Sequence, residues 1–197
     1  FVGVSPQKSD MPEFINAEWI SVRPGTDTAL MLGIAYVLED RKLADHEFLH
    51  SHCVGYEQFR DYLLGVKDGV AKTPDWASEI CSVAVSDIVS LAVKIAEKRT
   101  FLTAAWSLQR ADHGEQPYWM MIALACMAGH VGKPGGGFGF GYGAEGYIGS
   151  DWRRFNWANF PKSFNPTRFA IPVSRIADAL LYPGETIKYD GQEITYP

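Results

Sequence analysis

A polar loop near the middle of the chain carries side chains that could bind a ligand. It lies between an apolar run at residues 100–105 and an apolar segment at residues 118–131. Its chemically capable residues are Trp106, Gln109, Arg110, Asp112 and His113. Arginine and histidine can bind anionic groups, and an aromatic ring can lie against a flat ligand. An internal Arg–Asp pair is the simpler alternative, but five such groups in one loop favour ligand contact.

A second candidate is the turn at residues 23–27, Arg-Pro-Gly-Thr-Asp, between a strand-like run and an apolar helix. Free backbone N–H groups at a helix start favour anionic ligands, and Gly25 would let a ligand approach the backbone closely. The simpler alternative is a capped turn, with Thr26 or Asp27 as the N-cap. A carboxylate at Asp27 could also accept paired hydrogen bonds from the N1–H and exocyclic amine of guanine.

The third candidate is the sequence His46-Glu47-Phe48-Leu49-His50. It matches the H-E-x-x-H motif, in which two histidines one helical turn apart bind zinc and the glutamate is the general base. A catalytic zinc site also needs a third protein ligand and a cleft, and the surrounding polar sequence offers neither. We therefore expect His46 and His50 to bind no catalytic metal, with a zinc hydrolase as the less favoured alternative.

Glycines alternate with aromatic residues in the run GGGFGFGYG at residues 135–143. The run lacks the Gly-Lys-Ser/Thr end of a Walker loop, and it follows a helix rather than a strand, so it matches no dinucleotide fingerprint. We interpret it as a glycine loop whose backbone lies close to a flat ligand or to another domain. A helix C-cap followed by a linker is the alternative.

The elements that must position these loops alternate between strands and helices. Strand-like runs at residues 1–5, 19–22 and 100–105 are separated by helical patterns. This order predicts an α/β fold, a three-layer α/β/α arrangement with a mainly parallel, Rossmann-like sheet. Ligands of such sheets bind beyond the carboxyl ends of the strands, where the polar loops lie. Helices are also expected at residues 45–52, 56–64 and 173–181. Two more helices are expected to begin at Thr73-Pro74 and at Ser86-Asp87. A hairpin is expected at residues 187–197.

Composition limits the class of protein. The 197 residues fit a single α/β domain. The net charge is −5 and no basic run exceeds two residues, so no nucleic-acid partner is expected. No apolar stretch is long enough for a membrane span. The three cysteines, Cys53, Cys81 and Cys126, show no metal-ligand spacing and are interpreted as core thiols without a disulfide framework.

Residues 143–172 form an irregular region without helical or strand period. Its aromatic residues are Tyr147, Trp152, Phe155, Trp157 and Phe160. They are too many for a solvent loop, so we expect this region to pack against other domains. The chain also starts without methionine and directly on a strand-like run, which is typical of a piece of a longer protein.

Four stretches carry a resemblance to a known family: EWISVRPGTDTALMLGIAYVL, FLHSHCVGYEQF, WSLQRADHGEQPYWMMIALACMAGHVGKPGGGFGFGYG and IPVSRIADALLYPG. Together they resemble the dimethyl sulfoxide reductase family of molybdenum enzymes. The closest branch is that of the trimethylamine-N-oxide, dimethyl sulfoxide and biotin sulfoxide reductases. The second stretch stands where that family has a variable helix, which further lowers the weight of the zinc motif.

The resemblance implies a bis(molybdopterin guanine dinucleotide) molybdenum cofactor and oxygen-atom transfer from an S-oxide or N-oxide in the full-length protein. By matching motif positions, the implied cofactor-binding residues are Ser5, Gln7, Gly25, Thr26, Asp27, Trp106, Arg110 and His113. Within this set Asp27 would recognise guanine and Arg110 would contact phosphate or pterin. The first loop departs from the family's Asp-Pro, because it has Ser5-Pro6 instead.

The family's serine ligand to molybdenum belongs to a segment that precedes the matched region. The resemblance therefore implies that this chain has no catalytic or metal-ligating residue and, alone, neither activity nor bound cofactor. Its partners would be the remaining domains of the parent enzyme. The resemblance also implies a role in bacterial anaerobic respiration and a place in the periplasm rather than the cytoplasm, while the oxide and the electron donor stay open. A non-catalytic nucleotide-binding α/β module is the main alternative.

Overall fold

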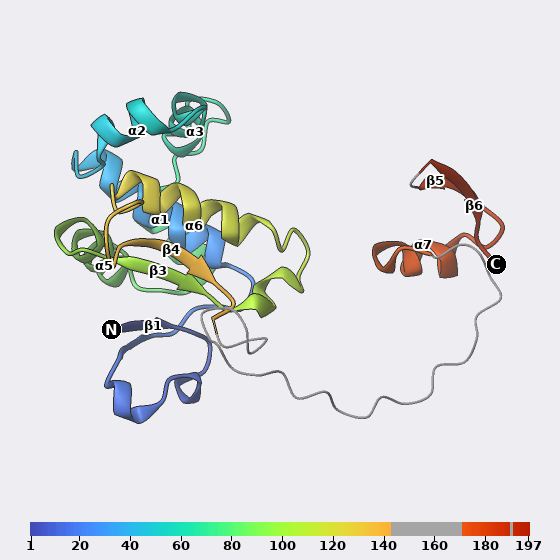
Figure 1. Cartoon of the computed structure of the whole chain (residues 1–197), viewed down its shortest axis with the longest axis horizontal. Coiled ribbons are helices and arrows are strands. Elements are labelled where there is room, and N and C mark those ends of the chain that lie inside the picture. Colours follow the sequence, from blue (N-terminus) through green and yellow to red (C-terminus); the bar gives the residue numbers. More distant parts are fainter. Residues whose placement is uncertain (143–170, 190) are drawn as a thin grey trace. The chain divides into compact units, whose positions relative to one another are not determined.

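The computed structural model describes residues 1–142, 171–189 and 191–197 (Figure 1). The chain separates into two compact units, Phe1–Arg154 and Phe155–Pro197. Of the irregular region expected at residues 143–172, positions 143–170 lie outside the described residues. The expected packing of its aromatic side chains therefore stays a prediction.

The first unit begins with a parallel pair of short strands. Strand β1 (Val2–Val4) pairs with β2 (Glu18–Ile20), and Val2 lies opposite Glu18. Two 3-10 turns, η1 (Lys8–Asp10) and η2 (Glu13–Ile15), connect the two strands. The predicted strands at residues 1–5 and 19–22 are thus confirmed.

A second parallel pair contains the predicted strand at residues 100–105 and one that was not predicted. Strand β3 (Phe101–Ala104) pairs with β4 (Gly137–Phe140), with Phe101 opposite Gly137. The interpretation of residues 135–143 as a glycine loop is wrong for this segment. Its glycines and aromatic residues alternate with a period of two, which is the side-chain period of a strand.

The sheet is less extensive than expected. Where the structure describes the chain, β1–β2 and β3–β4 form separate two-stranded sheets, and no ladder joins them. The three predicted strands are therefore divided between two sheets. The first unit is an α/β structure with small parallel sheets.

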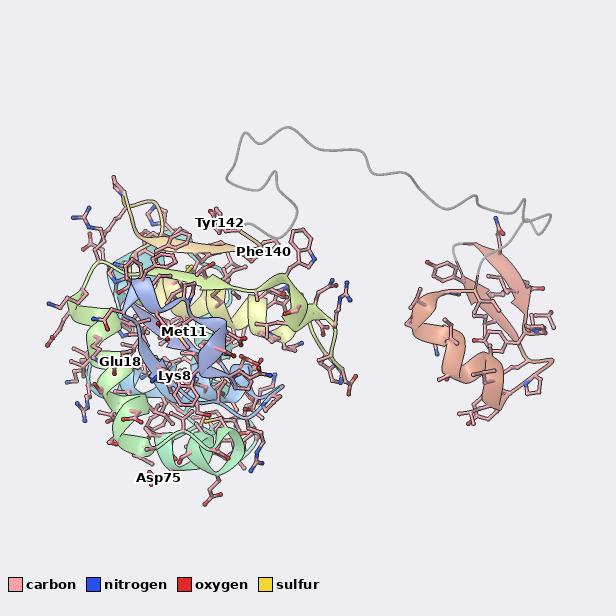
Figure 2. All side chains as sticks on the ribbon, turned by 90° about the horizontal axis from the view of Figure 1, so that it is seen from below. Lys8, Met11, Glu18, Asp75, Phe140 and Tyr142 are labelled. Atoms are coloured by element: carbon pink, nitrogen blue, oxygen red, sulfur yellow. The ribbon has the colours of Figure 1, made fainter. Side chains whose placement is uncertain are left out.

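Aromatic rings pack around the end of β4, where glycine makes room for them. Trp106 and Tyr118 each lie 5.5 Å from Phe140 between ring centres, and Phe101 lies 6.0 Å from Tyr142. Figure 2 labels Phe140 and Tyr142. A methyl group on Gly141 would overlap the Trp106 ring. The alternating glycines therefore allow aromatic packing against β3 and the segment after it.

Four helices enclose most of the core of the first unit. They are α1 (Asp27–Asp40), α4 (Pro74–Cys81), α5 (Val85–Glu97) and α6 (Gln116–Met127). Helix α1 packs against α4, α5 and α6. Nine of its residues are buried, which fits its nearly all-round apolar sequence.

The contact between α1 and α4 is close because α1 contains Gly33. A methyl group at Gly33 would lie only 2.6 Å from the Cβ of Ala77 on α4. Helix α4 starts as predicted, with Pro74 in its first turn and the Thr73 hydroxyl accepting a 3.2 Å hydrogen bond from the Trp76 N–H. This cap fixes the start of α4.

Two short helices, α2 (His46–His52) and α3 (Tyr56–Leu63), follow α1 as predicted. The Asp45 carboxylate caps α2 by accepting a 2.9 Å hydrogen bond from the Phe48 N–H. The Asp45 N–H donates to the Met127 carbonyl at 2.7 Å, which attaches the start of α2 to the end of α6.

The second unit is small. It contains η4 (Val173–Arg175), α7 (Ile176–Leu181) and an antiparallel hairpin of β5 (Thr186–Tyr189) and β6 (Gln192–Thr195). The predicted helix and hairpin are confirmed. Ile194 and Tyr196 are buried in this unit. Within the described ranges of both units, no helix is long and apolar enough to cross a membrane.

The packing of Gly141 gives a stability prediction. Gly141→Ala should lower the free energy of unfolding of the protein by about 2–4 kcal/mol, because it combines a left-handed backbone (φ 70°) with overlap on Trp106. Gly132→Ala is the matched control, since Gly132 is left-handed (φ 80°) but has no atom within 4 Å of the added methyl group. It should cost only about 1–2 kcal/mol. Urea unfolding measures both, and equal losses would contradict the proposed role of the ring contact.

Candidate functional site

The loop after β1 is held by internal hydrogen bonds of Ser5. The Ser5 N–H donates to the Ile20 carbonyl at 3.2 Å, and the Ser5 carbonyl accepts from the Trp19 indole N–H at 2.9 Å. Its hydroxyl donates to the Asp10 carboxylate and accepts from the Gln7 N–H at 3.2 Å. The loop is therefore shaped by Ser5, while the side chain of Gln7 is exposed.

The loop after β2 ends where helix α1 begins, at Asp27. Thr26 occupies the N-cap position, but its hydroxyl donates to the Arg23 carbonyl at 2.7 Å and caps no helix N–H. Gly25 has a left-handed backbone, and a methyl group there would meet nothing within 4 Å. The Thr26 side chain thus does not form the helix cap that the sequence offered as the simpler alternative. The space beside Gly25 is open.

Asp27 is the first residue of α1 and not its N-cap. Burial raises the pKa of its carboxyl group above the usual value, against a hydrogen bond from its own backbone that lowers it. The carboxylate makes no side-chain hydrogen bond or ion pair with another residue in the described ranges. Asp27 is therefore a half-buried acceptor at the positive end of a helix.

The loop after β3 begins with a 3-10 turn, η3 (Trp106–Gln109). Its backbone is fixed by the Tyr118 hydroxyl, which lies 2.9 Å from the carbonyl oxygens of both Ala105 and Trp106. The Trp106 ring is half-buried, whereas Arg110 is exposed. Tyr118 thus holds the start of this loop against α6.

The rest of this loop projects charged side chains into solvent. His113 is exposed and has a left-handed backbone with φ 53°. Its ring lies 3.8 Å from carboxylate oxygens of both Asp112 and Glu115. The alternative pairing of Arg110 with Asp112 does not occur between these two described side chains. Arg110 and His113 are thus both exposed to solvent.

The structure positions the three predicted loops through their strands. Each loop follows the carboxyl end of a parallel strand, β1, β2 or β3. Among the residues that the structure describes, no side-chain hydrogen bond or ion pair connects one predicted site loop with another. The backbone bond between Ser5 and Ile20 brings the first loop beside β2 only. The predicted residues therefore lie in three groups: Ser5 with Gln7; Gly25 with Thr26 and Asp27; and Trp106 with Arg110 and His113.

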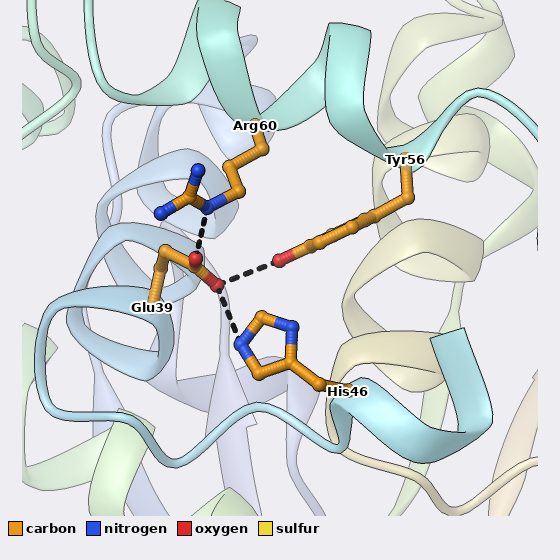
Figure 3. Close-up of polar contacts among 4 residues, drawn as sticks. All are labelled: Glu39, His46, Tyr56 and Arg60. Atoms are coloured by element: carbon orange, nitrogen blue, oxygen red, sulfur yellow. Dashed lines mark hydrogen bonds and ion pairs between the residues drawn. The ribbon is translucent and has the colours of Figure 1, made fainter. Parts of the chain in front are cut away.

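A polar cluster around the buried Glu39, at the end of α1, was not predicted from the sequence (Figure 3). The side chain of Glu39 is 5% exposed. It accepts a 2.7 Å hydrogen bond from the Tyr56 hydroxyl and pairs with Arg60, both on α3. The imidazole Nε2 of His46 lies 3.4 Å from the same carboxylate. One feature of the sequence could have indicated this cluster. Glu39 lies near the carboxyl end of an apolar helix, where the helix dipole disfavours a negative charge that has no partner.

The Glu39 cluster accounts for one histidine of the zinc-like motif. Burial alone would raise the pKa of Glu39, but hydrogen bonds from Arg60 and Tyr56 and the charge of His46 outweigh it and lower the pKa. The His46 ring therefore contacts Glu39, whereas the His50 side chain is exposed. Within the described residues there is no group of three or more His, Cys, Asp or Glu side chains that could hold a metal.

Comparison with known proteins identifies the family. The model of the molybdopterin oxidoreductase family matches residues 1–169. The chain belongs to the molybdopterin oxidoreductase family. A molybdopterin cofactor is therefore implied for the protein to which the chain belongs.

The curated relatives that this chain resembles include three oxide reductases. The chain is 44% identical to a trimethylamine-N-oxide reductase of Haemophilus influenzae over 98% of the chain and 25% of that protein. It is 42% identical to a biotin sulfoxide reductase and 38% identical to a dimethyl sulfoxide/trimethylamine N-oxide reductase, both of Cereibacter sphaeroides, over 98% of the chain. The chain is thus homologous to molybdenum-containing reductases of trimethylamine N-oxide, dimethyl sulfoxide and biotin sulfoxide, and it spans about a quarter of the length of these relatives.

A solved structure supports the fold of this molybdopterin oxidoreductase chain. Acetylene hydratase from Pelobacter acetylenicus superposes with a TM-score of 0.57 at 22% identity. The match covers 67% of this chain and 17% of that protein. The likeness concerns the fold alone.

The Glu39 cluster predicts a pH-dependent contribution to stability. Glu39→Gln should lower the free energy of unfolding at pH 7 by about 1–3 kcal/mol, since it removes the charged, buried acceptor of the Tyr56 and Arg60 hydrogen bonds. Because the pKa of Glu39 is lowered in the folded state, its stabilisation is present above about pH 4.5 and is lost as pH falls through the folded pKa. The difference between wild type and Glu39→Gln should therefore shrink in acid.

Glu47→Gln is the control, because Glu47 lies exposed on α2 next to His46. It should change stability by less than about 0.5 kcal/mol at either pH. Chemical denaturation at pH 7 and pH 3.5 measures both variants. A Glu39→Gln effect no larger than that of Glu47→Gln would show that the cluster contributes no net stability.

Proposed function

We propose that this chain is the molybdopterin guanine dinucleotide-binding part of an S-oxide or N-oxide reductase. One observation carries the proposal: the three loops that resemble the family's cofactor segments all follow carboxyl ends of parallel strands. Ligands of α/β sheets bind at such ends. The homology with three oxide reductases over nearly the whole chain supports the choice of substrate class.

The loop at Gly25 fits the nucleotide end of the cofactor. The space beside Gly25 admits close approach to the backbone, and the start of α1 offers N–H groups to phosphate. Asp27 is proposed to recognise guanine, because its half-buried carboxylate has free acceptors and can take two parallel hydrogen bonds from the guanine edge. Thr26 would contribute through its backbone, since its hydroxyl is already engaged.

The other two loops fit the charged and flat parts of the cofactor. Arg110 and His113 are proposed to neutralise phosphate or pterin groups, for which their exposure and charge suit them. Trp106, fixed by Tyr118 and Phe140, would give the pterin end a rigid neighbour. Ser5 would shape the first loop and leave Gln7 to make contact.

The chain's residues are proposed to bind and orient the cofactor, not to carry out chemistry. Bis(molybdopterin guanine dinucleotide) molybdenum, when bound, supplies oxygen-atom transfer from the oxide. The serine ligand to the metal and the remaining domains would come from other parts of the longer enzyme, so the isolated chain would lack both cofactor and activity. We further propose that the chain contributes to one three-layer α/β domain and that the enzyme acts in the periplasm.

Two other functions are less well supported. A non-catalytic nucleotide-binding module would use the same loops but would contain no molybdenum. A zinc hydrolase would need His46 and His50 together, whereas His46 contacts Glu39.

Metal content and activity of the full-length protein test the proposal. Protein produced with molybdate should contain molybdenum and guanine dinucleotide, and it should oxidise reduced viologen with trimethylamine N-oxide, dimethyl sulfoxide or biotin sulfoxide. Growth with tungstate in place of molybdate is the control and should remove molybdenum from the protein. Guanine nucleotide without molybdenum would favour the non-catalytic module.

The role of Asp27 is tested by Asp27→Asn in the full-length protein. The change places a donor opposite guanine donors and removes a charge-assisted hydrogen bond, at a cost of about 1.5–3 kcal/mol. Guanine dinucleotide affinity should fall roughly tenfold to more than a hundredfold. Cofactor content per folded protein is the measurement.

Asp75→Asn is the matched control, because Asp75 is also in the first turn of a helix, but on α4 and exposed (Figure 2). It should retain full cofactor at an unchanged melting temperature. Full cofactor occupancy in Asp27→Asn would reject the recognition role.

A further inference from the structure

The connection between α3 and α4 contains a buried lysine. The side chain of Lys72 is 2% exposed, although residues 66–70 just before it are all exposed. Lysine is rarely buried, because an ammonium group that leaves water needs other partners. The partners of Lys72 therefore indicate the role of this residue.

Two oxygen atoms of the same connection accept hydrogen bonds from the ammonium group. The Lys72 Nζ lies 2.6 Å from a carboxylate oxygen of Asp68 and also donates to the Val70 carbonyl. The other carboxylate oxygen of Asp68 accepts a 3.1 Å hydrogen bond from the Val70 N–H. Hydrogen bonds from Lys72 and from the Val70 N–H lower the pKa of Asp68, so its carboxylate is charged at neutral pH. The ammonium group thus has an anionic partner.

Two aromatic rings complete the surroundings of the ammonium group. The Lys72 Nζ lies 4.1 Å from the centre of the Tyr62 ring on α3 and 5.7 Å from the centre of the Trp76 ring in the first turn of α4. The face of an aromatic ring attracts a cation within about 6 Å of its centre. A carboxylate, a carbonyl and two rings therefore surround one ammonium group. We call this set of Tyr62, Asp68, Val70 and Trp76 the Lys72 cage.

The connection folds back tightly to bring these groups together. Gly65 and Gly69 have left-handed backbones, with φ 76° and 77°, and the Gly69 N–H donates to the Gly65 carbonyl at 2.9 Å. A methyl group on Gly65 would lie only 2.5 Å from the Ala71 nitrogen. The Lys72 N–H donates to the Leu63 carbonyl at 3.0 Å. Both the backbone and the side chain of Lys72 thus attach the end of the connection to α3.

We propose that the Lys72 cage is a binding site for a primary alkylammonium group, and that Lys72 occupies it as an internal ligand that holds the α3–α4 connection closed. None of the loops proposed to bind the cofactor takes part in it. The cage contacts the charge of the ligand and not its link to the backbone. It should therefore accept a free alkylammonium ion once the lysine side chain is removed.

Loss of the internal ligand should open the connection and leave the helices in place. Leu63 at the end of α3 and Ala77 on α4 are both completely buried in the core, so each helix has its own apolar anchor. Residues 66–70 are exposed and have no such anchor. Opening is therefore expected to be local, confined to the connection at residues 64–73.

Hydrogen exchange of the full-length protein, measured by mass spectrometry on peptides that cover residues 64–73, tests the proposal. In Lys72→Ala, exchange should be at least about tenfold faster than in wild type, because the cation–π contacts and a charged hydrogen bond are lost. Propylammonium ion has the atoms that this substitution removes and should restore slow exchange. The neutral molecule 1-propanol has nearly the same shape and should not. Peptides of α1 should exchange as in wild type, which separates local opening from global unfolding.

Further arms test the charge and the burial of Lys72 independently of the alanine variant. Lys72→Met keeps an apolar side chain without the charge and should still open the connection. Lys67→Ala is the matched control, because Lys67 lies in the same connection but is exposed, and it should leave exchange unchanged. In wild-type protein, an amine-acylating reagent should modify Lys67 at least about tenfold faster than Lys72, whose reaction requires opening.

Three results would overturn the proposal. Slow, wild-type exchange in Lys72→Met would mean that the charge does not hold the connection closed. Equal effects of propylammonium and 1-propanol on Lys72→Ala would mean that the cage does not recognise an ammonium group. Equal acylation rates of Lys67 and Lys72 in wild-type protein would mean that Lys72 is not enclosed in the whole enzyme.

Discussion

Burial of helix α1 on nearly all sides is the constraint on which the first unit depends. Ala35 and Leu38 are fully buried, and helices α3, α4, α5 and α6 all contact α1. An apolar helix of this kind gains about 25 cal/mol for each Å² of apolar surface removed from water, so it must be covered. Gly33 allows α4 to approach closely, and the covering helices then fix where the loops between them emerge.

The cover around α1 also explains why Glu39 needs partners. The helix extends its buried surface to its last turn, where the carboxylate would lose water without compensation. Tyr56 and Arg60 on α3, together with His46 on α2, supply the compensating hydrogen bonds and charge. The first histidine of the zinc-like motif, His46, thus contacts the carboxylate at the end of α1.

Sequence reasoning predicted the elements whose periodicity is local. The strands at β1, β2 and β3 and the helices from α1 to α6 follow from runs of apolar residues and from caps such as Thr73. It did not predict β4, because glycine has low strand propensity and the alternation of Gly137 to Phe140 has meaning only beside β3. Strand pairing and the Glu39 cluster join distant segments, which a pattern in one segment cannot specify. The site residues could be proposed only from loop position and family likeness, since their ligand lies outside the chain.

The alternation in β4 has a consequence for how this segment can vary in length. Phe140 faces Trp106 and Tyr118, while Gly139 and Gly141 leave room for the rings of Tyr142 and Trp106. Neighbouring strand residues point to opposite faces, so one residue inserted in β4 moves the glycines and aromatic residues that follow it in the strand to the opposite face. Two inserted residues restore the original faces. Length changes within Gly137–Phe140 are therefore subject to a parity rule: an even change keeps each side chain on its original face of the strand, and an odd change moves it to the other face.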